Sequence, residues 1–344
     1  MTQHSNSIQS ILKYATHISR VIIGLLFIYS GYVKLVDPIG TAIKFTEYFS
    51  EDVLNLTFLS PYVLPFSILL ILVELILGVM ILIGYKPKLS VWGVAILTLV
   101  FLSLTWYSAY FDKVTDCGCF GDAVKLSAWA TFYKNVFFSL LIVIMLFGLH
   151  YIKPWFGKTV TNWIPFITLF IGLFISYYVL QHLPIHDFRP FAIGKSIPEG
   201  MQDVAGEDFP PIHDFILEKP DFEATEIDES EEVTEAVLQA YKVLLIICYN
   251  LYESDYDSFE SIKTLADKAI EKEYLVYMLT ASYIDDFIEL KEEYQLPFDM
   301  LYADETVLKT MIRANPGLMT LNKGVVTGKW NWRDSKNTLT FVEK

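Results

Sequence analysis

Cysteine is scarce in this chain. Only three of the 344 residues are cysteines, and two of them, Cys117 and Cys119, are separated by a single glycine. The chain also has no P-loop, no dinucleotide-binding glycine motif and no HExxH zinc motif, so it gives no sign of the enzymes that depend on those sites. The cysteine pair, in the segment 116–122 (DCGCFGD), is therefore the main candidate for chemistry.

Acidic residues far outnumber basic ones in the second half of the chain. The whole chain has a net charge of −14, a mean hydropathy of +0.39 and 53% hydrophobic residues. Residues 1–183 have a net charge of +3, whereas residues 184–344 have a net charge of −17. The two halves therefore suit different solvents, a membrane and water. Nucleic acid and anionic lipid surfaces would repel the acidic half, so we predict no nucleic-acid partner.

Long apolar segments fill the first half. Five of them have the roughly 17–25 residues needed to cross about 30 Å of hydrocarbon, so the lipid bilayer is a predicted partner. The predicted spans are approximately residues 10–33, 61–85, 90–111, 135–152 and 159–183. The first span requires Arg20 and Lys34 to act as interfacial anchors whose charged ends reach the headgroups. A cleavable signal peptide is the alternative for the N-terminus, but no Ala-x-Ala-like site follows the apolar segment.

The short loops differ in their charges. Three segments carry Lys or Arg and no acidic residue: the one before the first span, the link between the second and third spans, and the link between the fourth and fifth. Loops with such a basic excess stay in the cytoplasm. The sequence therefore predicts a bacterial inner-membrane protein with a cytoplasmic N-terminus, and with both the cysteine loop and the acidic C-terminal domain in the periplasm.

The Cys117-Gly118-Cys119 element indicates reactive sulfur chemistry. A disulfide between cysteines at i and i+2 closes a very small, strained ring, and strained exposed disulfides exchange readily. Gly118 lets the backbone take the unusual angles that such a ring demands. Two alternatives remain: a pair of buried thiols or a local clamp on the loop, and a two-cysteine metal site, which no nearby histidine completes. We predict Cys117 and Cys119 as catalytic residues and no metal site.

A thiol relay through the membrane is excluded, because no cysteine lies in a span or in a predicted cytoplasmic loop. The partner of the loop is then either a thiol protein on the same side or a lipid-soluble acceptor such as a quinone. Glu74 lies within the second span, where a carboxylate is costly and should face the bundle interior, paired or protonated. We predict Glu74 as a cofactor-binding residue with a quinone or proton role; the alternative is a packing hydrogen bond.

Two sets of motifs resemble known membrane protein families. Residues 24–34 (GLLFIYSGYVK), followed by Asp37 and Pro38, resemble the first helix and loop of the DoxX family. Residues 74–78 (ELILG) and the CGCFG element at 117–121 resemble the methylamine utilisation family MauE, a related four-helix family. The CGCFG element is the most specific part of the resemblance.

The resemblance implies a redox association. MauE proteins are linked to the maturation of methylamine dehydrogenase, a periplasmic enzyme with many disulfides, and DoxX relatives are associated with quinone-linked sulfur oxidation. The resemblance covers about residues 10–155, so we predict a DoxX/MauE-like bundle at 1–158. Within the CGCFG element, Gly118, Phe120 and Gly121 are predicted to have structural or client-binding roles.

The region after the last span contains many prolines and acidic residues. We predict that residues 184–235 form a linker and the first strands of the C-terminal domain. The sequence Pro-Ile-His-Asp-Phe occurs in this region twice, so His186-Asp187 and His213-Asp214 are each candidates for a turn or for a metal site. We favour turns at the starts of strands.

Residues 236–344 alternate between strand and helix patterns. The predicted strands and helices are 243–249, 258–272, 274–279, 284–294, 317–320 and 324–330, the last two forming a hairpin. This order, with Asn315-Pro316 just before the hairpin, resembles the thioredoxin-like fold of the TlpA type. The resemblance implies a cis proline at Pro316 that borders the client-binding site.

The reactive position of this domain departs from the family pattern. The family has Cys-x-x-Cys just after the first strand of this unit, where this chain has Tyr252-Glu253-Ser254-Asp255. Cys248 lies inside the predicted strand and is expected to be a buried core thiol. The domain is therefore predicted to be redox-silent and to hold a client or act as an assembly module.

The predicted fold class is an all-α transmembrane bundle, with four DoxX/MauE-like helices and a fifth span, followed by an α/β thioredoxin-like domain. We predict that the cysteine loop exchanges thiol and disulfide equivalents with an extracytoplasmic client protein, with a quinone as the candidate electron acceptor. The alternative is a non-enzymatic scaffold or accessory factor for an envelope complex, whose cysteines only clamp the loop.

Overall fold

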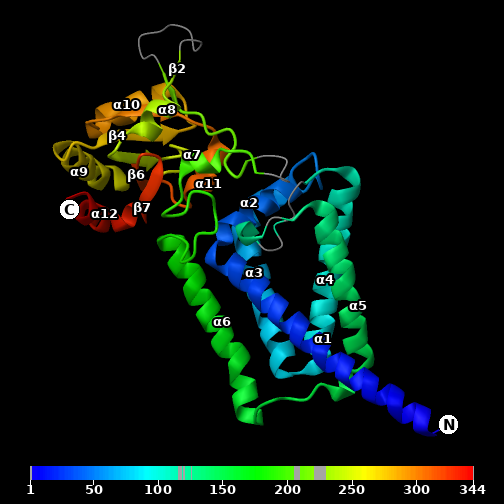
Figure 1. Ribbon diagram of the computed structural model, residues 1–344. Helices are drawn as coiled ribbons and strands as arrows, with labels where there is room; N and C mark the ends of the chain where they lie inside the picture. The colour runs from blue at the N-terminus through cyan, green and yellow to red at the C-terminus, as the bar shows by residue number, and fades with distance from the viewer. Residues whose placement is uncertain are drawn as a thin grey trace. The chain divides into compact units, whose positions relative to one another are not determined.

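The computed structural model describes residues 2–114, 118, 121–124, 126–204, 210–220 and 230–343. The chain forms two compact units, Met1–Leu180 and Gln181–Lys344, each with its own hydrophobic core (Figure 1).

The described part of the first unit is helical. Its elements are α1 (Thr2–Val36), α2 (Pro38–Phe49), η1 (Thr57–Tyr62), α3 (Val63–Ile83), α4 (Pro87–Phe111), η2 (Gly121–Ala123), α5 (Ala128–Phe147), η3 (Leu149–Tyr151) and α6 (Lys158–Gln181). Among the described residues, five helical segments are long and apolar enough to cross a membrane. They are Ser7–Val36, Thr57–Ile83, Pro87–Phe111, Ala128–Phe147 and Lys158–Gln181. The prediction of five spans is confirmed, and the chain is a membrane protein.

The contact between α1 and α3 depends on glycine. A Cβ atom on Gly78 of α3 would lie 2.9 Å from the backbone nitrogen of Ile28 and 3.1 Å from the carbonyl oxygen of Gly24. Membrane helices use small residues in this way to bring their backbones close together, since lipid removes the hydrophobic drive for helix association. Apolar side chains fill the centre of the bundle: Ile23, Phe27, Ile81, Val91, Val94, Ile142 and Met145.

Arg20 of α1 is buried against the end of α3. Its side chain is 1% exposed. The guanidinium donates hydrogen bonds to the carbonyl oxygens of Ile81 (3.0 Å), Leu82 (2.9 Å) and Lys153 (3.0 Å). The last carbonyls of a helix have no donor within the helix, so this cation satisfies the end of α3. The interfacial position predicted for Arg20 stays a prediction, and the carbonyls that meet its charge were not visible in the sequence.

The helix α2 was not predicted. Asp37 begins it by accepting a hydrogen bond at Oδ1 from the backbone nitrogen of Gly40 (2.9 Å), and Pro38 occupies the first helical position. With 12 residues, α2 is too short to cross a bilayer, and it packs against α3. Its start signal, Asp followed by Pro, was visible in the sequence, but its pattern is too short to stand out.

The second unit is an α/β domain built on one sheet. Its elements are α7 (Ile197–Gly200), β1 (Glu218–Lys219), β2 (Glu231–Glu232), α8 (Thr234–Gln239), β3 (Val243–Ile247), α9 (Ser258–Glu271), β4 (Leu275–Thr280), α10 (Ile284–Tyr294), β5 (Asp299–Tyr302), α11 (Glu305–Met311), β6 (Gly317–Asn322), β7 (Val325–Asn331), η4 (Trp332–Asp334) and α12 (Ser335–Glu343). The strand order among the described residues is β2-β1-β5-β4-β3-β6-β7.

The strand directions confirm the predicted α/β class. β3, β4 and β5 are parallel, and β6 and β7 form an antiparallel pair on the other side of β3. The Asn315–Pro316 peptide bond just before β6 is cis, as the resemblance implied. Together, the strand order and the cis proline are those of a thioredoxin-like fold. β5, α11 and α12 were not predicted, because they are short and apolar periodicity needs longer segments to show.

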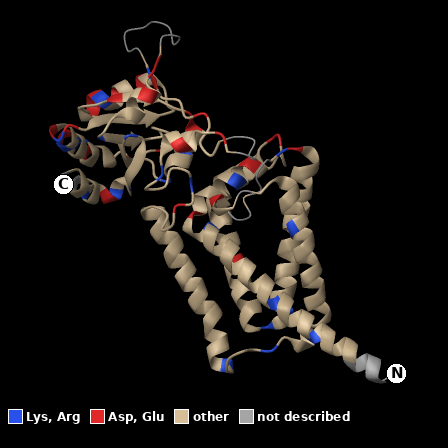
Figure 2. Cartoon of the chain, in the orientation of Figure 1, with Lys and Arg blue, Asp and Glu red and all other residues tan. Residues whose placement is uncertain are grey.

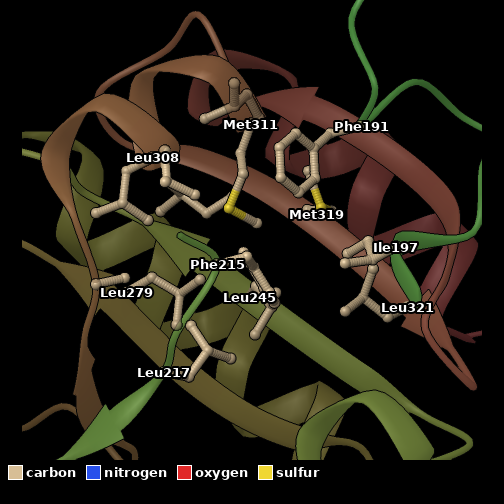
Figure 3. Close-up of a cluster of buried hydrophobic side chains, with 14 of the residues drawn as sticks. Phe191, Ile197, Phe215, Leu217, Leu245, Leu279, Leu308, Met311, Met319 and Leu321 are labelled. Carbon is tan, nitrogen blue, oxygen red and sulfur yellow. The ribbon is translucent and has the colours of Figure 1, made fainter. Parts of the chain in front are cut away.

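Figure 3 shows the apolar cluster on one face of the sheet, where Leu245 and Met319 lie with Phe191, Ile197 and Phe215. These last three side chains are 3% exposed or less. They come from the region predicted as a linker with first strands. That region therefore packs into the second unit and completes its core.

Candidate functional site

Glu74 of α3 and Lys34 of α1 form a buried ion pair inside the membrane unit. Lys34 Nζ lies 2.7 Å from Glu74 Oε2, and the two side chains are 4% and 3% exposed. Ser30 of α1 donates a hydrogen bond from Oγ to Glu74 Oε1 (2.5 Å). The expectation that Glu74 faces the interior and is paired is confirmed, and the interfacial role expected for Lys34 is wrong. Cofactor binding by Glu74 stays a prediction.

The geometry of α1 explains this arrangement. Ser30 and Lys34 lie one helical turn apart, so both side chains reach the same carboxylate. Each charge would be costly in hydrocarbon without the other. The ammonium of Lys34 also lies 5.3 Å from the centroid of the Phe101 ring, a cation–π contact. Sequence reasoning missed Lys34 as the partner, although a lysine and a carboxylate in two neighbouring spans were an available signal.

A small cavity with several polar side chains in its wall adjoins the ion pair. Its volume is about 20 Å³, and its walls come from α1, α3, α4 and α5. Thr98 of α4 and Asn135 of α5 line it, each 3% exposed. Asn135 donates a hydrogen bond from Nδ2 to Thr105 Oγ1 (3.2 Å). The interior of this bundle thus contains a compact group of polar side chains surrounded by apolar ones.

The loop with the two cysteines connects α4 to α5, which begins after its N-cap Ser127. Gly118 in this loop has a φ of +66°, a conformation that favours glycine, as expected for this position. A Cβ atom on Gly118 would lie 3.0 Å from Lys44 Cγ, so this part of the loop lies against α2. A Cβ atom on Gly121 would lie 3.2 Å from Val33 Cγ1, next to the last turn of α1.

Cys117, Cys119 and Phe120 lie outside the described residues. Their catalytic and structural roles, and those of Gly118 and Gly121, stay predictions. Gly118 and Gly121 lie at the end of the bundle where α1 ends and α2 begins.

Residues 12–148 match the family model for methylamine utilisation protein MauE. The match confirms the MauE resemblance and includes both the ion pair and the cysteine loop. It covers less than half of the chain, and α6 and the second unit lie outside it. A comparison with curated proteins gives no match. Residues 12–148 are called the MauE-like segment below.

The second unit has a different arrangement at the position where its fold family carries cysteines. The backbone nitrogen of Leu251 donates to Ser282 Oγ (3.0 Å), and Asn315 Nδ2 donates to the carbonyl of Asn250 (2.6 Å). These hydrogen bonds fix the segment after β3 next to the cis proline. Pro316 is buried there, and its predicted client-binding role is not tested by this geometry.

Cys248, directly after β3, is fully buried. Burial raises the pKa of its thiol to about 12. A thiol with so high a pKa is protonated at neutral pH and is a poor nucleophile. The expectation of a buried core thiol is confirmed, and the described part of the second unit offers no other cysteine for exchange.

The solution structure of a thiol:disulfide interchange protein from Bacteroides sp. is among the solved structures that match this chain at a distance. The sequence identity is 12%, the alignment covers 38% of this chain and 87% of that chain, and the TM-score is 0.30. A likeness this distant carries no argument about function. The thioredoxin-like assignment rests on the strand order and the cis proline of this chain.

Asp187 takes part in an ion cluster of the second unit. It accepts hydrogen bonds from the backbone nitrogen (3.1 Å) and Nε (2.7 Å) of Arg189, and Lys329 Nζ lies 2.5 Å from its other oxygen. Burial lowers the pKa of Lys329 to about 7, and Arg189 adds to this shift. The hydrogen bond from the Arg189 backbone to Asp187 is turn chemistry, but no described strand starts there, and the turn predicted at His213-Asp214 stays a prediction. Among the described residues, no group of three or more His, Cys, Asp or Glu side chains is placed to hold a metal.

Proposed function

We propose that this membrane protein has a redox-related role, in which the Cys117-Gly118-Cys119 loop exchanges thiol and disulfide equivalents with an extracytoplasmic client protein. The observation that carries the proposal is the position of Gly118 against α2, at one end of the helical bundle that the MauE-like segment forms. Lys44 and Glu47 of α2 form a partly exposed ion pair (2.9 Å), and charged side chains are costly in hydrocarbon, which supports an aqueous position for this end of the bundle. A client thiol in water could therefore reach the loop.

The proposed exchange begins with a disulfide between the two loop cysteines. A client thiolate attacks one sulfur, forms a mixed disulfide and releases the other loop cysteine as a thiolate. A second client thiolate then breaks the mixed disulfide, so the client gains a disulfide and the loop becomes a dithiol. Two electrons and two protons pass from the loop to a quinone, which becomes a quinol. The strain of a small ring favours this direction, because strained disulfides are more oxidising.

The proposed quinone would lie near Glu74 but not inside the bundle. The cavity beside Glu74 measures about 20 Å³, which is too small for a quinone ring. Both carboxylate oxygens of Glu74 already have partners, Ser30 and Lys34. Glu74 would therefore influence a quinone at the lipid-facing side of the bundle without direct contact.

The proposed topology has the cysteine loop and the second unit in the periplasm. Figure 2 supports it: the link between α5 and α6 shows basic and no acidic residues, whereas α2 shows both. Basic links stay in the cytoplasm. Arg20 contacts the end of α3 and Lys153 of that link, so these elements share one end of the bundle. Five alternating crossings then bring the chain after α6 to the side of the loop.

Alkylation trapping tests the exchange. In intact cells quenched with acid, thiols are alkylated and the redox states of Cys117 and Cys119 are separated by mass, in a Cys248→Ala background that removes the third cysteine. We expect reduced, oxidised and partner-linked forms, and we expect Cys119→Ser to trap the partner. A single invariant state in every growth condition would contradict the proposal.

The second candidate function is a non-enzymatic scaffold for an envelope complex. The absence of a Cys-x-x-Cys motif after β3, where Asn250 and Leu251 are held by hydrogen bonds, favours this alternative. The two candidates differ in the effect of Cys117→Ser. Loss of function at an unchanged protein level supports exchange, and wild-type behaviour supports the scaffold.

A further inference from the structure

The cavity beside the ion pair contains a hydroxyl group without a partner. Thr98 is 3% exposed, and its Oγ1 has no hydrogen-bond partner within the part of the chain that the structure describes. Threonines in helices usually donate to the carbonyl four residues earlier, as Thr105 of the same helix does to Phe101 (2.7 Å). Thr98 does not, although a buried hydroxyl without a partner is costly. The cavity beside Thr98 offers a place for a partner.

The ammonium of Lys34 has the complementary deficit. It carries three N–H donors. Among the described residues, its one hydrogen-bond acceptor is Glu74 Oε2. The side chain is 4% exposed, so solvent outside the bundle does not satisfy the remaining donors. The wall of the cavity therefore offers spare donors from Lys34 and an unpaired hydroxyl from Thr98.

We propose that this cavity binds one water molecule, which accepts a hydrogen bond from Lys34 Nζ and donates one to Thr98 Oγ1. A water site needs at least about 10–15 Å³ of cavity volume and two to four polar partners. The cavity has about 20 Å³, and Ser30 and Asn135 also line it. A quinone oxygen could accept the same hydrogen bond, but its ring could not enter this volume.

The bound water explains how a charged pair is tolerated within the bundle. It completes the hydrogen bonding of the cation without bringing bulk solvent or another protein group into the hydrocarbon region. This inference goes beyond the proposed exchange and does not depend on it, because it rests on side chains of α1 and α4 and not on the cysteine loop.

The direction of the change in melting temperature caused by Thr98→Val tests the proposal. Valine keeps the shape of threonine and removes the hydroxyl. If a water joins Thr98 to Lys34, the full-length variant in lipid–detergent micelles should melt lower, by roughly 2–4 °C. If the hydroxyl has no partner, removing it should leave the melting temperature unchanged or raise it, which would overturn the proposal.

Ser176→Ala is the matched control. Ser176 of α6 is also 3% exposed and its Oγ also lacks a partner among the described residues, but it does not line this cavity. We expect this variant to melt at or above the temperature of the wild type. A drop equal to that of Thr98→Val would overturn the proposal, because it would show that loss of any buried hydroxyl has the same effect.

Radiolytic labelling gives a direct second measurement on the wild-type chain. X-rays convert bound water to hydroxyl radicals, which oxidise the side chains next to it. Phe27 lines the cavity and is 5% exposed, whereas Phe259 lies in the core of the second unit and is fully buried. We expect Phe27 to be labelled well above Phe259. Equal labelling of the two rings would overturn the proposal even if Thr98→Val failed to fold.

Discussion

The ion pair between Lys34 and Glu74 should show strong energetic coupling. Lys34→Met leaves the Glu74 carboxylate buried with Ser30 as its remaining hydrogen-bond partner, and Glu74→Met removes the one acceptor that the ammonium has among the described residues. Breaking a buried pair in this way costs about 3–5 kcal/mol, whereas replacing both partners by apolar residues is often neutral. We therefore expect each single variant to lose about 3–5 kcal/mol and the double variant to lose less than either, a coupling of at least about 3 kcal/mol.

The assay is equilibrium unfolding of the full-length chain in mixed lipid–detergent micelles with increasing SDS, followed by helical circular dichroism. Lys44→Met is the matched control, because Lys44 pairs with Glu47 at 2.9 Å but is 30% exposed, and such a pair contributes about 1 kcal/mol or less. Two results would refute the reasoning: a loss below about 1 kcal/mol for Lys34→Met, or a double variant whose loss equals the sum of the single losses.

Three further outcomes are expected. Arg20→Met should lose about 2–4 kcal/mol in the same unfolding assay, because three carbonyls lose their donor, while Lys13→Met on the exposed part of α1 should change less than about 0.5 kcal/mol. The pKa of Lys329 is about 7 in the folded chain, against 10.5 for an ordinary lysine, so between these pH values the unfolded chain binds the proton more tightly. Folding stability should therefore rise from pH 7 toward pH 10, measured as protection of the β3 amides from hydrogen exchange. Lys329→Met should flatten this rise. Cys248 should resist maleimide in the folded Cys117→Ser/Cys119→Ser variant and react only after denaturation; fast labelling of the native chain would contradict its burial.

The elements that the sequence predicted well are those whose signal is continuous. The spans are long apolar segments, and β3 consists of five residues that are all buried, so neither depends on knowing a distant partner. β5 has four residues with mixed burial, and no periodicity can be recognised over that length. Phe191 and Ile197 lie among prolines and glycines, which hid their place in the core of the second unit.

The candidate site was only partly predictable for a related reason. A carboxylate in a span signals a partner because an isolated charge is costly there, but it does not say which partner. Lys34 is 40 residues away from Glu74, and its position near the end of a span fits an interfacial anchor equally well. Thr98 carried no signal at all, because a threonine in an apolar helix normally bonds to its own backbone.

The two buried cations of α1 both bind α3, and this sets the register of the two helices. Arg20 meets the last carbonyls of α3 and Lys34 meets Glu74, two contacts separated by about 21 Å along a helix that rises about 1.5 Å per residue. Gly24 and Gly78 lie between them, where the backbones touch. A slip of one turn would break both ionic contacts at once. Because Gly121 of the cysteine loop lies against the last turn of α1, the charges buried within the bundle also determine where that loop is held.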